Sequence, residues 1–317
     1  MPSPSPSKTL ATLRPDLGGS FMEFDLEANM NGFIGLSVFT PIEVDYPADT
    51  FGRVKMSSLL KQVPNTERAP GSTYARDRFE FEDDSYKTRD NGVEYPIDDR
   101  NNRAHRNYIN AELAAARKGR NTVLTAHESR VSAALAASTN TTGVVGGAWS
   151  AVATCKPLDD VDAAIAAMWD RGIIANTLVI SWKLYRFLRR ASQLTVRLEQ
   201  TNQAQPSVIR DTQLAELFDL DQVLIAGGRK LGSTASSVRG LWSDTEAYVT
   251  RVDNSIDIEE PCVGRTLHYS DDGSALGGVI EEYRDESRRS NMIRTRMDTD
   301  EKTLFPEAIQ KITGVNP

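Results

Sequence analysis

The feature that most constrains the fold is a stretch of 40 residues from Asp98 to Ala137 that contains no proline. Apolar side chains recur in it at helical spacings: Ile109, Leu113, Ala116, Leu124, Val131 and Leu135. A continuous helix of that length would run about 60 Å at 1.5 Å per residue, which exceeds the diameter of a compact domain. Gly119 and Asn121 each cost up to about 1 kcal/mol relative to alanine, so we expect a kink or break there.

The first 50 residues cannot form a long helix, because prolines and glycines interrupt them repeatedly. The prolines are Pro2, Pro4, Pro6, Pro15, Pro41 and Pro47. The segment is therefore predicted to be an extended arm. Such a composition at a terminus is typical of a disordered tail. The alternative is an arm that a neighbouring chain holds in an ordered position.

A charged, two-stranded excursion is predicted over residues 66–95. Residues 72–82 alternate, with Tyr74, Arg76, Arg78, Glu80 and Glu82 on one face and Ala75, Asp77, Phe79 and Phe81 on the other. Asn91-Gly92 adds a tight-turn signal before Val93. An isolated hairpin is only marginally stable in water, so the excursion is expected to pack against a larger structure. The alternative is that the excursion is a solvated hairpin of mixed charge, and this applies to each of its residues taken singly.

A composition shift at residues 139–147 marks the best candidate domain boundary, and an alternating α/β unit follows it. A helix is predicted after Pro157, with Gly172 as its C-terminal cap. Strands are predicted at 177–181, 222–226 and 246–252, and short helices at 182–190 and 212–220. The remainder, 256–317, is predicted to be rich in strands, with few helices and with hairpin corners at 271–273 and 277–278.

The charge balance disfavours strong general binding of nucleic acid. Lys and Arg total 37 against 44 Asp and Glu, which gives a formal net charge of −7. The two cysteines, Cys155 and Cys262, make no disulfide framework and fit a reducing compartment. No run approaches the roughly 20 apolar residues of a membrane span, and the N-terminus lacks the pattern of an export signal.

The residue types and spacings predict no catalytic, cofactor or metal site. His105, His127 and His268 lack the neighbours of zinc ligands, and no serine or cysteine lies in a nucleophile motif. The loop at 227–240 has the glycine spacing of a phosphate-binding loop, but Ser233 stands where the lysine belongs. We expect the three cations of this loop, Arg229, Lys230 and Arg239, to line a pore or to meet acidic groups on another chain.

The order of these elements resembles the major capsid protein fold of tailed bacteriophages, an α+β fold. The resemblance covers nearly the whole chain. The local sequences that carry it are four stretches: 161–165, 176–181, 213–225 and 241–244. The resemblance implies an N-terminal arm at 1–50, an E-loop at 51–95, and a peripheral domain with a spine helix at 96–150. It further implies an axial domain at 151–244 that points toward the five-fold and six-fold axes, and return strands of the peripheral sheet at 245–317.

The resemblance also implies a non-enzymatic subunit that assembles as pentamers and hexamers into an icosahedral shell around double-stranded DNA. Its implied partners are copies of itself, a portal, a separate scaffolding protein, decoration proteins and weakly bound packaged DNA. The location would be the virion capsid, assembled in the host cytoplasm, with no cofactor and no membrane. We expect the contacts between subunits at Tyr74, Arg76, Arg78, Phe79, Phe81 and Glu82. The alternatives are an encapsulin-type compartment that encloses cargo enzymes, and a soluble α/β enzyme that uses the cleft near 227–240.

Overall fold

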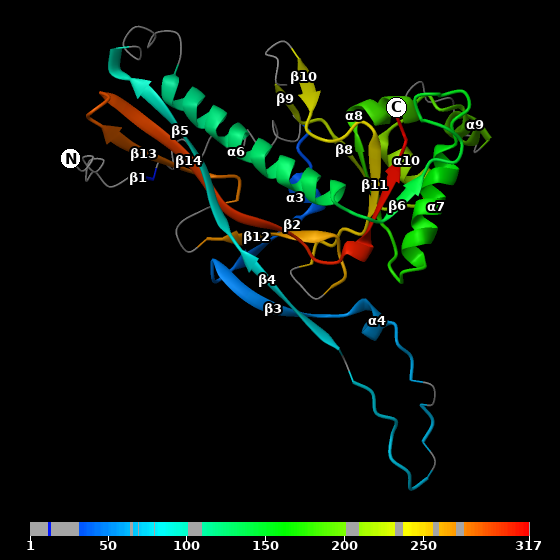
Figure 1. The fold of residues 1–317 in the computed structure, drawn as a ribbon. Helices are drawn as coiled ribbons and strands as arrows, with labels where there is room; N and C mark the ends of the chain where they lie inside the picture. The colour runs from blue at the N-terminus through cyan, green and yellow to red at the C-terminus, as the bar shows by residue number, and fades with distance from the viewer. Residues whose placement is uncertain are drawn as a thin grey trace.

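The computed structural model describes residues 12–13, 32–63, 66–68, 70–78, 80–100, 110–200, 209–231, 237–255, 260–270 and 276–316. These residues form two separate sheets and a long two-stranded ribbon that projects away from both (Figure 1). One sheet is covered by a single long helix, and the other is surrounded by four shorter ones.

The larger sheet has six strands and is built around β14. Its strands are β1 (Thr12–Leu13), β2 (Thr40–Val44), β5 (Arg89–Asp98), β12 (Gly264–Tyr269), β13 (Val279–Asp285) and β14 (Ser290–Thr303). The first half of β14 pairs with β13 on one edge and β5 on the other, and its second half pairs with β12. Because β14 lies between β12 and β13, Gly277-Gly278 is not the hairpin corner that the sequence predicted, and 271–273 lies outside the described residues.

The long helix, α6 (Ala111–Ala136), lies along this sheet against β5 and β14 (Figure 1). Its N-cap is Asn110, whose side chain accepts a hydrogen bond from the backbone N–H of Leu113 at 3.2 Å. The predicted start was wrong, because Asp98 ends β5, and the predicted break was wrong, because α6 continues through Gly119. A Cβ on Gly119 would lie 2.4 Å from Oγ1 of Thr295, so the glycine lets helix and sheet approach closely.

The smaller sheet has five strands in the order β6-β15-β11-β7-β8. Their bounds are Thr141–Gly143, Ile309–Thr313, Glu246–Thr250, Thr177–Ser181 and Gln222–Ala226, respectively. The surrounding helices are α7 (Pro157–Trp169), α8 (Trp182–Leu188), α9 (Ser192–Gln200) and α10 (Asp211–Leu217). We call this assembly the α/β unit. The predicted helices at 158–168, 182–190 and 212–220 and the strands at 177–181, 222–226 and 246–252 are confirmed to within two or three residues.

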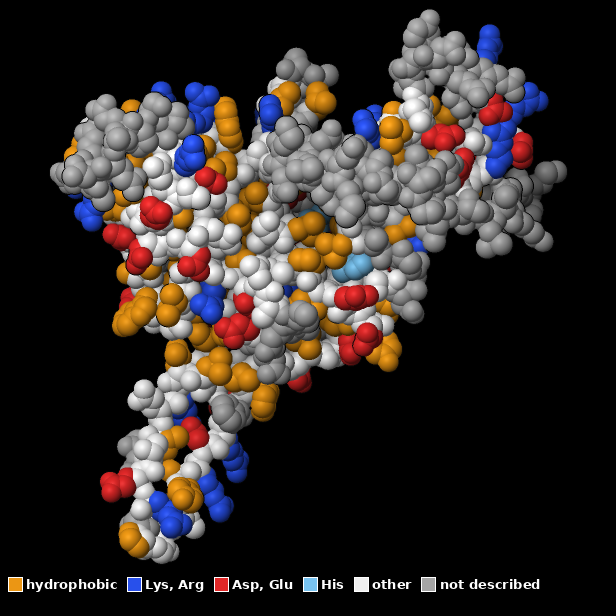
Figure 2. Space-filling view, turned by 180° about the vertical axis from the view of Figure 1, so that it is seen from behind, with side chains coloured by type: hydrophobic (Ala, Val, Ile, Leu, Met, Phe, Trp, Pro, Cys, Tyr) orange, Lys and Arg blue, Asp and Glu red, His pale blue; other side chains and the backbone are white. Residues whose placement is uncertain are grey.

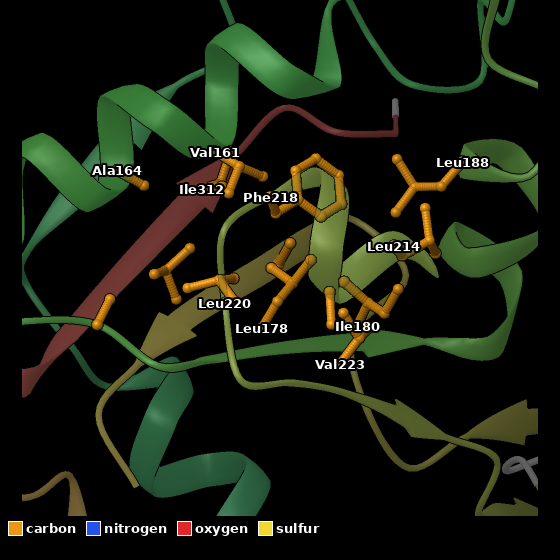
Figure 3. Packing of buried hydrophobic residues seen from close by; sticks show 14 of the residues in the cluster. Val161, Ala164, Leu178, Ile180, Leu188, Leu214, Phe218, Leu220, Val223 and Ile312 are labelled. Atoms are coloured by element: carbon orange, nitrogen blue, oxygen red, sulfur yellow. The ribbon is translucent and has the colours of Figure 1, made fainter. Parts of the chain in front are cut away.

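Apolar side chains of the helices and of one face of the smaller sheet meet in the core of the α/β unit (Figure 3). Val161 and Met168 of α7 are fully buried, as the predicted helical stripe requires. The chain leaves α7 through Gly172, whose φ of +84° is the left-handed conformation expected of a C-terminal cap.

The α/β unit also recruits strands from outside the predicted range of 151–244. β6 adds an edge parallel to β15, and β11 occupies a central position between β15 and β7. The expectation that 245–317 returns entirely to the larger sheet was therefore wrong. Ala247–Thr250 is buried residue after residue, and such a strand needs cover on both faces, which the centre of the smaller sheet supplies.

The ribbon consists of β3 (Ala48–Val54) and β4 (Phe81–Lys87), which pair antiparallel from Ala48–Lys87 to Val54–Phe81. The predicted hairpin over 66–95 was wrong, because β4 pairs with β3 while β5 pairs with β14. Asn91-Gly92 is not a turn but part of β5. A Cβ on Gly92 would lie 3.0 Å from Cβ of Arg296, so this glycine serves close strand packing.

The remaining described helices are three short elements. They are α3 (Gly35–Val38), α4 (Met56–Leu59) and the 3₁₀ turn η1 (Pro306–Ala308). A short hairpin of β9 (Arg229–Leu231) and β10 (Val238–Gly240) projects from the α/β unit. Among the described helices, none is both long and apolar enough to cross a membrane.

Candidate assembly surfaces

The base of the ribbon is fixed to the rest of the molecule by two cations. Arg53 of β3 donates to the backbone oxygen of Leu304 and to Glu82 of β4 at 2.8 Å, and its guanidinium lies 5.5 Å from the centre of the Phe305 ring. Lys302 of β14 donates to Asp84 of β4 at 2.7 Å. The ribbon therefore leaves the body at a defined angle rather than swinging freely (Figure 1).

These contacts perturb the carboxyl groups of β4. The hydrogen bond from Arg53 holds the pKa of Glu82 below its usual value. Partial burial pushes the pKa of Asp84 upward, but hydrogen bonds from Lys302 and from the backbone N–H of Ser85 outweigh it and lower that pKa. Both groups therefore stay ionised at neutral pH and keep the base of the ribbon paired.

Beyond this base, the described residues 59–63, 66–68, 70–78 and 80 form what we call the ribbon tip, which extends away from the body without strand pairing among them. Lys61 donates to Asp77 at 2.6 Å, and this contact joins its two limbs. Arg68 lies 4.8 Å from the centre of the Tyr74 ring. Figure 2 shows cationic, anionic and apolar side chains intermixed on this projection.

The residues predicted for subunit contacts lie on or next to the tip and point largely to solvent. Tyr74 is 68% exposed and Phe81 67% exposed, while Arg76 and Arg78 are also exposed. Glu82 is half-buried by its contacts with Arg53 and Lys55, so it acts within the chain. Phe79 lies outside the described residues. The strand predicted from residue 72 begins only at 81, because no described strand pairs with 70–78.

A buried contact holds the described end of the N-terminal segment, from residue 32 on, to the body. Glu128 of α6 is 1% exposed and accepts hydrogen bonds from the backbone N–H groups of Ile34 at 3.0 Å and Gly35 at 2.6 Å. It also accepts from Nε1 of Trp242 at 2.5 Å. Burial raises the pKa of Glu128 even though these three donors favour its charged form.

This carboxylate joins three parts of the chain: α3, α6 and the segment that follows β10. A Cβ on Gly35 would lie 2.5 Å from Oε2 of Glu128, so only glycine lets the backbone come this close. The sequence analysis missed Glu128. It lies four residues after Leu124 and three before Val131, so a carboxylate within the apolar stripe was the signal that could have found it.

The second candidate surface is the hairpin of β9 and β10. Arg229, Lys230 and Arg239 are all exposed on it, and Arg239 lies directly opposite Lys230 in the register. Leu231 and Val238, the next pair, are 67% and 65% exposed. An open cleft of about 620 Å³ lies at the base of the hairpin, where the sequence placed a candidate enzyme cleft.

The described histidines and cysteines lie inside the packed body. His127 and His268 are buried, Cys155 and Cys262 are buried free thiols, and His105 lies outside the described residues. Within the described ranges, no cluster of three metal-ligating side chains is present. Nε2 of His127 lies 3.1 Å from Oγ1 of Thr266 and 3.7 Å from Glu301, and burial lowers its pKa to about 4.

No protein-family model and no curated protein matches the chain. Several solved structures match the chain. A phage-related protein from Bordetella bronchiseptica RB50 is 21% identical, with a TM-score of 0.68 and coverage of 96% of this chain and 98% of that one. The capsid structure of the cyanophage P-SCSP1u is 11% identical, with a TM-score of 0.58 and coverage of 88% and 87%. The chain has the capsid fold of tailed phages.

Encapsulins share this capsid fold. The SrpI encapsulin of Synechococcus elongatus PCC 7942 is 9% identical to the chain, with a TM-score of 0.53 and coverage of 87% and 86%. The fold that the sequence resemblance implied is therefore confirmed. At these identities the likeness concerns the fold alone.

Proposed function

We propose that the chain is the major capsid protein of a tailed phage, which assembles as pentamers and hexamers into an icosahedral shell around double-stranded DNA. The observation that carries the proposal is the ribbon tip, which leaves large apolar side chains in solvent although its base is firmly held. Leu59 and Leu60 of the tip are 45% and 53% exposed, and Tyr74 is 68% exposed. Such side chains gain stability when a neighbouring subunit covers them.

In this proposal the described strands revise the expected division of the chain. The E-loop is the ribbon with its tip, residues 48–88, rather than 51–95. The peripheral domain is the six-stranded sheet with α6 as its spine helix. The axial domain is the α/β unit, which includes β6, β11 and β15, and it points toward the five-fold and six-fold axes. Tyr74, Arg76, Arg78, Phe79 and Phe81 make the E-loop contacts, and Glu82 orients the loop.

The chemistry of the surface fits a shell that holds DNA loosely. A net charge of −7 disfavours tight general binding of phosphate, which would oppose the movement of packaged DNA. The proposed partners are other copies of the chain, a portal, a scaffolding protein and decoration proteins. The proposed location is the virion capsid after assembly in the host cytoplasm, and the protein is proposed to have no enzymatic activity.

An encapsulin-type compartment is the second candidate, because the fold likeness extends to the encapsulin. The content of purified particles distinguishes the two. Electron microscopy of the expressed full chain is expected to show closed particles tens of nanometres across. Particles from the native source that contain DNA would support the capsid, and particles with a dedicated cargo enzyme and no DNA would support the compartment. A compact monomer at all concentrations would refute both.

A further inference from the structure

Positive charge is concentrated on one part of an otherwise acidic chain. Residues 182–210 and 227–241 together hold nine of the 37 Lys and Arg residues and one of the 44 Asp and Glu residues. The described residues of both ranges belong to the α/β unit and its hairpin, and Figure 2 shows Lys and Arg side chains along the upper edge of this unit. Within an acidic protein, such a segregation of cations favours an anionic ligand.

The cleft at the base of the hairpin lies between these two cationic ranges. Lys183 of α8 and Arg229 of β9 both line it. Neither cation forms an ion pair with a carboxylate in the part of the chain that the structure describes, and both are exposed. The two cations come from separate segments of the chain, and the carboxylate of Asp244 lines the same cleft. Each cation can donate hydrogen bonds to phosphate oxygens.

The other lining side chains supply an aromatic surface and a hydrogen-bond acceptor. Trp182 is 54% exposed, and Arg186 lies 5.0 Å from the centre of its ring. Asp244 accepts a hydrogen bond from Oγ of Ser181 at 2.7 Å through Oδ1. Its carboxylate can accept a further hydrogen bond from a hydroxyl or amino group in the cleft.

We propose that this cleft binds a nucleotide, with its phosphates on Lys183 and Arg229, its base against Trp182 and a ribose hydroxyl or base amine on Asp244. A volume of about 620 Å³ is in the range of small-molecule sites and admits one nucleotide but no duplex. The nucleotide is either free or one unit of a single strand, since both carry the same groups. This site goes beyond the proposed shell function and does not depend on it.

The test is calorimetric titration of the full chain with ADP at 150 mM salt. We expect one saturable site per chain. The double variant Lys183→Ala, Arg229→Ala should weaken ADP binding by at least about tenfold. The matched control Arg190→Ala removes an exposed cation that belongs to the same basic range but does not line the cleft, so it should change the affinity by less than about twofold.

A second variant separates recognition of the base from simple charge attraction. Trp182→Leu should weaken ADP but leave inorganic pyrophosphate unchanged. Displacement of ADP by a thymidine octanucleotide would assign the site to a single strand, and retention of ADP would assign it to free nucleotides. Absence of saturable ADP binding, or equal weakening by Arg190→Ala, would overturn the proposal. Counting particles of the same samples by electron microscopy tests the shell separately.

Discussion

The buried carboxylate of Glu128 should hold the N-terminal segment to the body, and replacing it by glutamine tests this directly. Oε1 accepts from Ile34 and Trp242, and Oε2 accepts from Gly35 at 2.6 Å. A glutamine keeps the shape but offers only one acceptor oxygen. If that oxygen serves Ile34 and Trp242, the amide NH₂ faces the N–H of Gly35, and two donors then oppose each other.

The magnitude follows from these contacts. A hydrogen bond to a charged group contributes about 1.5–3 kcal/mol, and an unsatisfied buried donor costs about 1–3 kcal/mol. Relief of the buried charge offsets part of this loss, because burial already raises the pKa of Glu128. We therefore expect Glu128→Gln to lower the free energy of unfolding by about 2 kcal/mol. For a chain of 317 residues that corresponds to a fall in Tm of roughly 3 °C.

Differential scanning fluorimetry of the unassembled subunit measures the effect. The matched control is Glu216→Gln, which removes the same charge from an exposed position on α10 and should change stability by less than about 0.5 kcal/mol. The reasoning is refuted if Glu128→Gln melts within a degree of the wild type, or if Glu216→Gln melts as early.

Three further perturbations have definite expected outcomes. Lowering the pH from 7 to 5 should reduce the free energy of unfolding by about 2 kcal/mol through His127. The pKa of His127 is about 4 in the folded chain and 6.5 in the unfolded chain, so only the unfolded chain takes up the proton in this range. In denaturant titrations, His127→Gln should lose this contribution to the pH dependence. Phe81→Ser removes a side chain that is 67% exposed in the subunit, so light scattering should show about tenfold more protein needed for assembly while Tm stays constant; an unchanged threshold contradicts the E-loop contact. Gly119→Ala should destabilise the protein by about 1–3 kcal/mol in thermal melts, despite the higher helix propensity of alanine. The control Asn121→Ala, on the exposed face of α6, should not destabilise it. A more stable Gly119→Ala variant would show that the helix can move away from Thr295.

Local elements of the α/β unit were predictable because their signals are local. Pro157 and Gly172 delimit α7, and the apolar run at 177–181 forms β7 with the predicted bounds. The period of the apolar residues also indicated α6, although not its start. These features depend on neighbours within one or two turns of the chain.

Strand pairing was not predictable, because it depends on residues far apart in the sequence. Asn91-Gly92 has the composition of a tight turn, yet β14, about 200 residues later, provides a partner that extends β5 through it. β11 and β15 were assigned to the wrong sheet for the same reason. At the candidate surfaces, the sequence singled out Tyr74 and Phe81 but placed them on opposite faces of a strand, whereas both are exposed. The contacts of Arg53 with Leu304 and Phe305 had no local signal.

Cryo-electron microscopy of assembled particles tests the central claim most directly. It would show whether the ribbon of one subunit lies on its neighbour. We predict that Leu59, Tyr74 and Phe81, which are exposed in the single chain, are covered by the adjacent subunit in a closed shell. A preparation that contains only monomers, or a shell in which the ribbon tip stays in solvent, would contradict the account.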